Sequence, residues 1–146
     1  MEQTGAQGRL AFVYGPVKRG GPLHHRLGPA ELIGAAVLPG FRMFQVGAAP
    51  CIIPSSSPAD EVHGEVWRIS DHQLRLLDLI EGGAYRRTVG VARVESGERV
   101  EVVTWAWAFS EFGLKPIPSG EWNASRHRVL RPRGADPTPE IDERAG

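Results

Sequence analysis

Two short segments of the sequence carry residue types that a catalytic or binding site requires. The first is the corner Tyr14-Gly15-Pro16-Val17, where an apolar run ends and a glycine-rich loop begins. A glycine-rich loop that leaves a strand can turn successive backbone N–H groups toward one point and so bind an anion. The loop lacks the Gly-Lys-Ser/Thr ending of nucleotide phosphate loops. An ordinary surface turn is the alternative interpretation.

The second segment ends in a single carboxylate, Glu81, which is followed by Gly82-Gly83. We expect Glu81 in the last turn of a helix, where the negative end of the helix dipole disfavours ionisation. Partial burial would raise its pKa further, toward the range that general acid–base catalysis uses. The alternative is a solvated glutamate that merely ends the helix.

The helix that would position Glu81 is the clearest element of the sequence. Ser70 and Gln73 have the spacing of a capping box, and Gly82-Gly83 is a strong stop signal. Leu74, Leu77 and Ile80 supply the apolar stripe, with Leu76 and Leu79 beside it.

Apolar, β-prone runs predict most of the remaining elements. The expected strands and extended pieces are 10–14, 41–46, 51–54, 62–69, 85–94 and 99–109. The last two are predicted to form a hairpin, and Trp105, Trp107 and Phe109 would share one face, in the core or in a pocket wall. A phase change between Val102 and Val103 indicates a bulge or burial on both faces. These strands and one good helix predict a strand-dominated α+β domain, a small barrel being one form.

Length and composition predict a single domain, and they exclude several classes of protein. The chain has 146 residues, and we expect a flexible N-terminus over 1–9, a folded domain over 10–130 and a disordered tail over 131–146. A short final helix over 124–130 is a further expectation. Seventeen basic and seventeen acidic residues argue against a strongly basic nucleic-acid binder.

Few residues favour metal binding, redox chemistry or membrane insertion. His24 and His25 are adjacent and lack a partner at ligand spacing, so we expect no metal site. Cys51 is the only cysteine, which makes an intrachain disulfide impossible and a cytoplasmic location the default expectation. No run approaches the ~20 apolar residues of a membrane span.

Taken together and in order, several segments resemble the gamma-glutamylcyclotransferase-like family, in its AIG2-like and gamma-glutamylamine cyclotransferase branches. The matching pieces are Phe12 to Gly20, His25, Gly34, Gly40, Val62 to Trp67, Leu77 to Gly82, Tyr85 to Arg87 and Gly120 to Trp122. The resemblance implies a compact mixed β-barrel with flanking helices. It also implies a reaction in which the α-amine of a gamma-glutamyl substrate attacks its own γ-carbonyl and releases 5-oxoproline and an amine.

The resemblance assigns roles to residues of this sequence. Glu81 matches the family's catalytic glutamate, the loop 14–19 matches the segment that binds the glutamyl group through backbone N–H groups, and Tyr85 matches a pocket tyrosine. We therefore expect Tyr14, Gly15, Pro16, Val17, Lys18 and Tyr85 to bind a small-molecule gamma-glutamyl substrate, with no cofactor and no nucleic-acid or membrane partner.

One departure from the family pattern affects the predicted binding loop. The family usually has Ser or Thr and then Leu after Tyr-Gly, whereas this chain has Pro16 and Val17. Proline has neither an N–H nor a hydroxyl group, so one potential donor to the substrate is missing. A non-catalytic binding module on the same fold is therefore the alternative to an enzyme.

Overall fold

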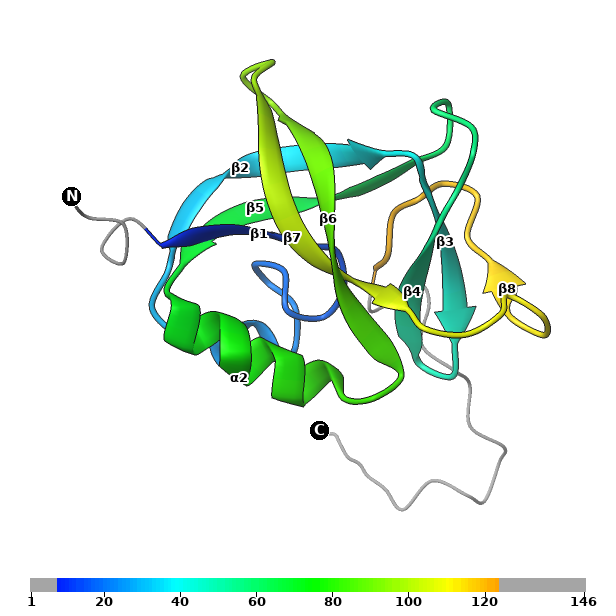
Figure 1. Cartoon of the computed structure of the whole chain (residues 1–146), viewed down its shortest axis with the longest axis horizontal. Helices are drawn as coiled ribbons and strands as arrows, with labels where there is room; N and C mark the ends of the chain where they lie inside the picture. The colour runs from blue at the N-terminus through cyan, green and yellow to red at the C-terminus, as the bar shows by residue number, and fades with distance from the viewer. Residues whose placement is uncertain (1–7, 124–146) are drawn as a thin grey trace.

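The computed structural model describes residues 8–123, which form a barrel, a small second sheet and one α-helix (Figure 1). The expected tail and the helix expected over 124–130 lie outside the described residues, as does most of the N-terminal segment. The elements in chain order are β1 (Arg9–Val13), the 3-10 helix η1 (His24–Leu27), β2 (Glu31–Pro39), β3 (Phe41–Val46), β4 (Ala49–Pro54), β5 (Glu61–Ile69), α2 (Asp71–Glu81), β6 (Tyr85–Val94), β7 (Arg99–Trp107) and β8 (Lys115–Pro116).

The barrel is closed and mixed, with strand order β1-β5-β2-β6-β7. Its neighbouring strands are antiparallel except for β1 and β7, which run parallel and close the barrel through Ala11 and Val103. The expected α+β fold with a small mixed barrel is therefore confirmed. Of the expected flanking helices, the described residues contain the single α-helix α2 and the short η1.

Strand β7 is buried on both faces, which explains the phase change in its sequence. Val102 and Ala106 point into the barrel, whereas Val103 and Trp105 belong to a second apolar cluster that packs against α2. The pairing of β6 with β7 continues without a register shift across this point. Burial on both faces is thus the correct alternative, and a bulge is not. The strand ends at Trp107 and not at Phe109 as expected, and the Phe109 side chain is 63% exposed.

Helix α2 begins and ends where its sequence predicts. Ser70 and Gln73 form the reciprocal capping box, and Gly82 ends the helix at a φ of 75°, a conformation that favours glycine. Leu74 and Leu77 are buried against the barrel. Leu76 and Leu79 lie on the solvent side, so the apolar stripe is narrower than the sequence suggested. The helix therefore lies across one end of the barrel with Glu81 as its last residue.

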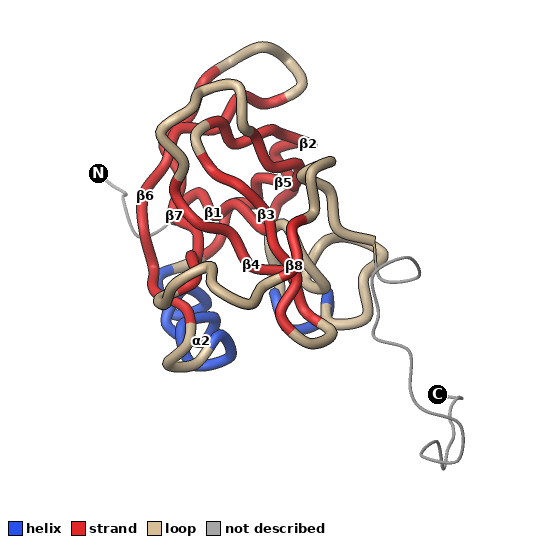
Figure 2. The backbone as a smooth tube through the Cα atoms, turned by 90° about the vertical axis from the view of Figure 1, so that its right-hand side faces the viewer, coloured by secondary structure: helices blue, strands red, loops and turns tan. Residues whose placement is uncertain are grey.

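The second sheet has the order β4-β3-β8 and stands beside the barrel (Figure 2). The sequence predicted β3 and β4 but not the two-residue strand β8, and it did not assign the region of β2 to a strand. The N-terminal end of β4 brings Ala49 and Pro50 toward the loop that follows β1. None of the helices in the described part of the chain is long and apolar enough to cross a membrane.

Candidate active site

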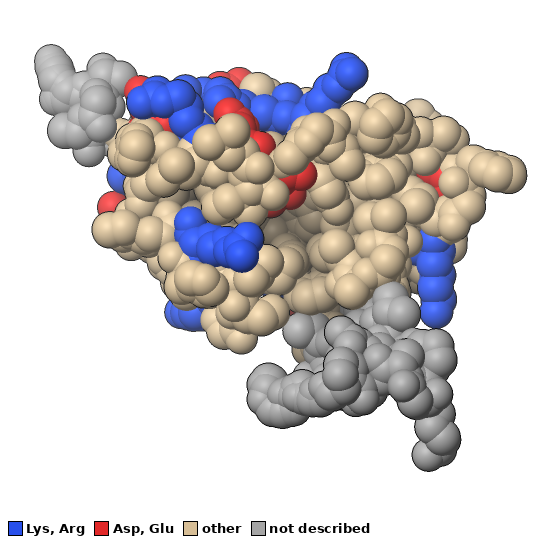
Figure 3. Space-filling view, turned by 90° about the horizontal axis from the view of Figure 1, so that it is seen from below, with Lys and Arg blue, Asp and Glu red and all other residues tan. Residues whose placement is uncertain are grey.

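A cavity of about 210 Å³ lies where the loop after β1 meets the last turn of α2. Its wall includes the loop residues from Val13 to Val17, the end of α2, the start of β4 and Tyr85 of β6. Figure 3 looks onto this side of the molecule and shows a hollow in the surface, bordered mostly by residues without charge. The fold thus brings together the two segments that the sequence singled out, which are about 65 residues apart along the chain.

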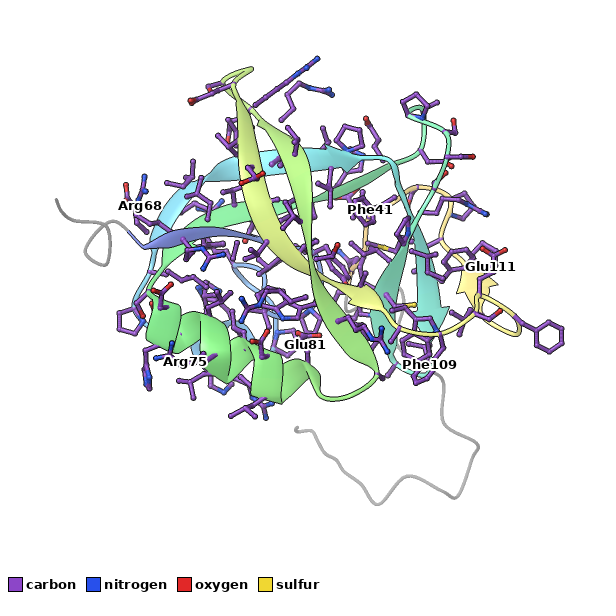
Figure 4. All side chains as sticks on the ribbon, viewed as in Figure 1. Phe41, Arg68, Arg75, Glu81, Phe109 and Glu111 are labelled. Atoms are coloured by element: carbon purple, nitrogen blue, oxygen red, sulfur yellow. The ribbon has the colours of Figure 1, made fainter. Side chains whose placement is uncertain are left out.

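Glu81 lies in the wall of this cavity, at the end of α2 beneath the barrel strands (Figure 4). Burial raises the pKa of its carboxyl group from 4.5 to about 7. Within residues 8–123 the carboxylate has no hydrogen-bond or ion-pair partner, so no contact in this part of the chain offsets the loss of solvation. A carboxyl group with a pKa near neutrality can both accept and return a proton, which is what general acid–base catalysis requires.

Tyr14 and Gly15 form the floor of the cavity through close contacts. The buried Tyr14 hydroxyl donates to the carbonyl of Trp105 at 2.6 Å, and burial raises its pKa well above the usual value. The phenol is therefore neutral and fixed in place. A Cβ atom on Gly15 would lie 2.7 Å from Cγ of Pro50, so only glycine allows β4 to approach this closely.

The loop retains two backbone donors for a ligand. Pro16 has no N–H, and its carbonyl accepts from the N–H of Leu23 at 2.9 Å. In the described part of the chain, no acceptor takes the N–H of Gly15 or of Val17. These two N–H groups are therefore the loop's remaining candidates for binding a carboxylate or a developing oxyanion.

The position of Lys18 corrects one expectation from the sequence. Its backbone N–H donates to the carbonyl of Gly15 at 3.0 Å and closes a turn. Its ammonium group donates to the carbonyl of Trp122 at 3.0 Å, and Lys18 does not line the cavity. The physical reason is the tight turn at Pro16, which directs the chain away from the cavity after Val17.

Tyr85 stands at the cavity wall, where β6 begins. Its hydroxyl donates to the carbonyl of Pro50 at 2.9 Å, and its ring packs edge-on against Trp107. Burial raises the pKa of this phenol, so it remains protonated and joins β6 to β4.

Asp78, one helical turn before Glu81, attaches α2 to the barrel. Its Oδ1 accepts a hydrogen bond from the indole Nε1 of Trp105 at 2.8 Å, and its carboxylate also pairs with Arg87. The hydrogen bond to Arg87 lowers the pKa of Asp78, so Asp78 and Glu81 titrate in different pH ranges. Trp105 is both core and cavity wall, which combines the two alternatives that the sequence left open.

Several cavity residues were not predicted from the sequence. Arg26, Leu23 and Pro50 line the wall, but they come from η1, its preceding turn and β4. No local pattern marks Pro50, because its contact with Gly15 depends on the tertiary packing. The positive charge of Arg26, directly after the His24-His25 pair, was the one sequence signal available for this residue.

Other candidate groups lie away from the cavity or are inert. Cys51 is buried, and burial raises the pKa of its thiol to about 12, so it is protonated at neutral pH. This agrees with a packed thiol and not a nucleophile. Among the described residues, no group of three or more His, Cys, Asp or Glu side chains is placed to hold a metal ion.

Comparison with known sequences identifies relatives over most of the chain. The family model described as gamma-glutamyl cyclotransferase, AIG2-like, matches residues 11–124. AIG2-like protein A of Arabidopsis thaliana is 36% identical over 123 residues, covering 82% of this chain and 72% of that protein. The gamma-glutamylcyclotransferase family protein YtfP of Escherichia coli (strain K12) is 30% identical over 115 residues, covering 76% of this chain and 93% of its own length.

Solved structures share the fold. A crystal structure of an AIG2-like protein from Mus musculus superimposes with a TM-score of 0.69 at 24% identity, covering 88% of this chain and 98% of that one. A solution structure of an Arabidopsis thaliana protein gives a TM-score of 0.61 at 31% identity, covering 73% and 78% of the two chains.

Proposed function

The chain belongs to the AIG2-like gamma-glutamyl cyclotransferase family, and from this premise we propose that it cleaves a gamma-glutamyl amine or a small gamma-glutamyl peptide. The products are 5-oxoproline and a free amine. The observation that carries the proposal is Glu81, a half-buried carboxyl group without a partner in the described residues and with a pKa of about 7, which lines the same cavity as the loop 14–17.

Glu81 serves as the base in the first step. The substrate's α-ammonium has no lone pair, so its nitrogen cannot attack until it loses a proton. The Glu81 carboxylate accepts this proton, the α-nitrogen bonds to the γ-carbonyl carbon, and the carbonyl electrons move onto oxygen. A base whose pKa is about 7 is deprotonated in a large share of molecules at neutral pH, yet basic enough to accept the proton.

The second step reverses the direction of proton transfer. The oxygen electrons return, the bond to the leaving nitrogen breaks, and protonated Glu81 donates to that nitrogen. The Glu81 carboxylate formed in this way then takes a second proton from the ring nitrogen and passes it to the released amine. The α-nitrogen keeps one of its three protons in the lactam, and the other two leave with the amine as an ammonium ion. The reaction is balanced without water or a redox partner, because the nucleophile belongs to the substrate. This is why we propose that it needs no cofactor.

The remaining cavity groups orient the substrate. The N–H groups of Gly15 and Val17 can bind either the substrate's carboxylate or the developing oxyanion, and fixed donors to an oxyanion are worth several kcal/mol in other enzymes. The apolar side chains of Leu77 and Trp105 limit the volume of the cavity. A small cavity favours a folded substrate with its amine close to its carbonyl.

The proposal is tested with a panel of gamma-glutamyl amines and gamma-glutamyl dipeptides. 5-Oxoproline is measured by chromatography with the wild-type protein and with a no-protein control. We expect release from at least one class of substrate, with one amine released for each 5-oxoproline. A wild-type protein that binds such compounds but turns none of them over would be the non-catalytic binding module instead.

We further propose a reducing cytoplasmic location for this activity. Cys51 is the only cysteine of the chain and remains a buried free thiol, which suits such a compartment. Labelling of the native protein with a thiol reagent should leave Cys51 unmodified, whereas the unfolded protein should react fully.

A further inference from the structure

The cavity contains a basic side chain that the proposed reaction has not used. Arg26 lines the wall together with Glu81, and among the described residues these two are the charged side chains of the cavity. Within residues 8–123 the Arg26 guanidinium has no hydrogen-bond or ion-pair partner. The cavity wall therefore carries one positive group, the exposed guanidinium of Arg26, and one negative group, the half-buried carboxylate of Glu81.

The loop 14–17, which lines the same cavity as Arg26, is short of hydrogen-bond donors. Pro16 has no N–H, and the N–H of Lys18 is bound to the carbonyl of Gly15. A substrate carboxylate in this cavity therefore finds only the N–H groups of Gly15 and Val17 in the loop. A carboxylate has about four acceptor sites on its two oxygens, so two backbone donors leave it incompletely satisfied.

The backbone of Arg26 is linked to this loop through Leu23, whose carbonyl accepts from the N–H of Arg26 at 2.9 Å. The N–H of Leu23 donates to the carbonyl of Pro16 at 2.9 Å, and His24 Nδ1 contacts the carbonyl of Val17 at 2.9 Å. The ring of His24 also packs against Trp67, and Leu27 is fully buried beneath η1. Proline at position 16 and arginine at position 26 thus belong to one hydrogen-bonded unit.

We propose that Arg26 binds the α-carboxylate of the substrate's glutamyl group and replaces the donor that Pro16 lacks. The inference rests on the proposed function for the identity of the ligand. An α-amino acid head group is a zwitterion, and the cavity offers one group of each charge: Glu81 for the ammonium and Arg26 for the carboxylate. A guanidinium can donate two parallel hydrogen bonds to a carboxylate, which also fixes its orientation.

The test is a binding measurement that needs no turnover. 5-Oxoproline carries the carboxylate, and 2-pyrrolidinone is the same ring without it. Both are titrated by NMR into the wild-type protein and into Arg26→Gln. We expect the wild type to prefer 5-oxoproline, and Arg26→Gln to bind it about tenfold more weakly, the low end for a charged hydrogen bond at an exposed site. Affinity for 2-pyrrolidinone should not change, which also shows that the variant is folded.

Two further variants sharpen this measurement. Arg75→Gln removes an exposed arginine of α2 that lies outside the cavity wall, and it should bind 5-oxoproline as the wild type does (Figure 4). Pro16→Ser restores an N–H and adds a hydroxyl, so the double variant Pro16→Ser/Arg26→Gln should recover part of the lost affinity. A merely structural role of Arg26 would not produce this recovery.

The possible outcomes separate the inference from the proposed function. Equal binding of 5-oxoproline by the wild type and Arg26→Gln would overturn the inference. So would a loss confined to gamma-glutamyl dipeptides, because Arg26 would then contact the carboxylate of the leaving group. Binding that depends on Arg26, in a protein without turnover, would support the inference and contradict the proposed activity alone.

Discussion

The indole Nε1 of Trp105 donates a hydrogen bond to Oδ1 of Asp78 at 2.8 Å and so joins the C-terminal part of β7 to the last turn of α2. The carbonyl of the same tryptophan accepts from Tyr14. One residue of the barrel thereby fixes both halves of the cavity, the loop floor through its backbone and the helix that carries Glu81 through its side chain.

The first prediction concerns Asp78 as a positioning residue. Asp78→Ala removes the acceptor for Trp105, so the end of α2 loses its hydrogen bond to the barrel and activity should fall about tenfold, the scale of an active site that is slightly misplaced. Asp78→Asn retains an amide oxygen for the indole and loses only the partly exposed ion pair with Arg87, which is worth less than about 1 kcal/mol. Its activity should remain within about threefold of wild type.

This pair of variants distinguishes positioning from simple stability. The free energy of unfolding is measured by urea titration for both, and kcat and KM are measured at a temperature where both are folded. If Asp78→Asn were as inactive as Asp78→Ala, the hydrogen bond to Trp105 would not be the relevant contact.

The second prediction concerns the cost of burying Glu81. Its folded-state pKa of about 7 exceeds the value of 4.5 for a free glutamate, so between these pH values the folded state binds more protons than the unfolded state. Its contribution to stability is fully present below about pH 4.5 and is lost as the pH rises through 7. A shift of this size corresponds to at most about 3 kcal/mol.

Glu81→Gln lacks this titration and provides the comparison. The difference in unfolding free energy between Glu81→Gln and wild type should move in favour of the variant from about pH 4.5 to about pH 8, because only the wild type loses stability in this window. The remaining pH dependence of the protein cancels in the difference. A constant difference across the window would show that Glu81 is not desolvated.

The third prediction concerns the close approach of β4 to the binding loop. Gly15→Ala places a Cβ atom 2.7 Å from the ring of Pro50, so one of the two segments must move. We expect a loss of about 1–3 kcal/mol in stability, typical of overpacking, and weaker binding of 5-oxoproline. Gly83→Ala is the control, because a Cβ atom there meets open space. Similar losses in both variants would contradict the packing argument.

The fourth prediction is the pH dependence of activity. Because the carboxylate form of Glu81 must accept the first proton, kcat/KM should rise with pH through a midpoint near 7, the pKa of Glu81 in the free protein. Below this value the group is protonated and activity should fall about tenfold for each pH unit. The measurement is 5-oxoproline release under kcat/KM conditions from about pH 5 to pH 8.5. A profile without a rising limb in this range would exclude Glu81 as the base.

Local patterns predicted the elements well, because each has a local cause. The capping pair Ser70 and Gln73 and the stop at Gly82 define α2, and they place Glu81 at the helix end before any tertiary contact is considered. Alternating apolar residues predicted most strands of the barrel. The resemblance to the family then joined the helix end to the loop at Tyr14, and the cavity contains both.

The parts that could not be predicted depend on contacts between distant segments. Both faces of β7 are buried because the barrel lies on one side and α2 on the other, and alternation alone does not distinguish this from a bulge. Pro50 reaches the cavity only because Gly15 lacks a side chain. Lys18 was assigned to the site from its position in the loop, but the turn at Pro16 directs it to Trp122.

The measurement that tests the central claim most directly is 5-oxoproline release by wild type and by Glu81→Gln on the best gamma-glutamyl substrate at about pH 8. Glutamine keeps the size of glutamate but cannot accept the proton, and general acid–base catalysis contributes about 10²–10⁴-fold. We predict that kcat for Glu81→Gln falls by at least about a hundredfold while binding of 5-oxoproline is retained. Turnover by Glu81→Gln equal to that of the wild type would contradict the account.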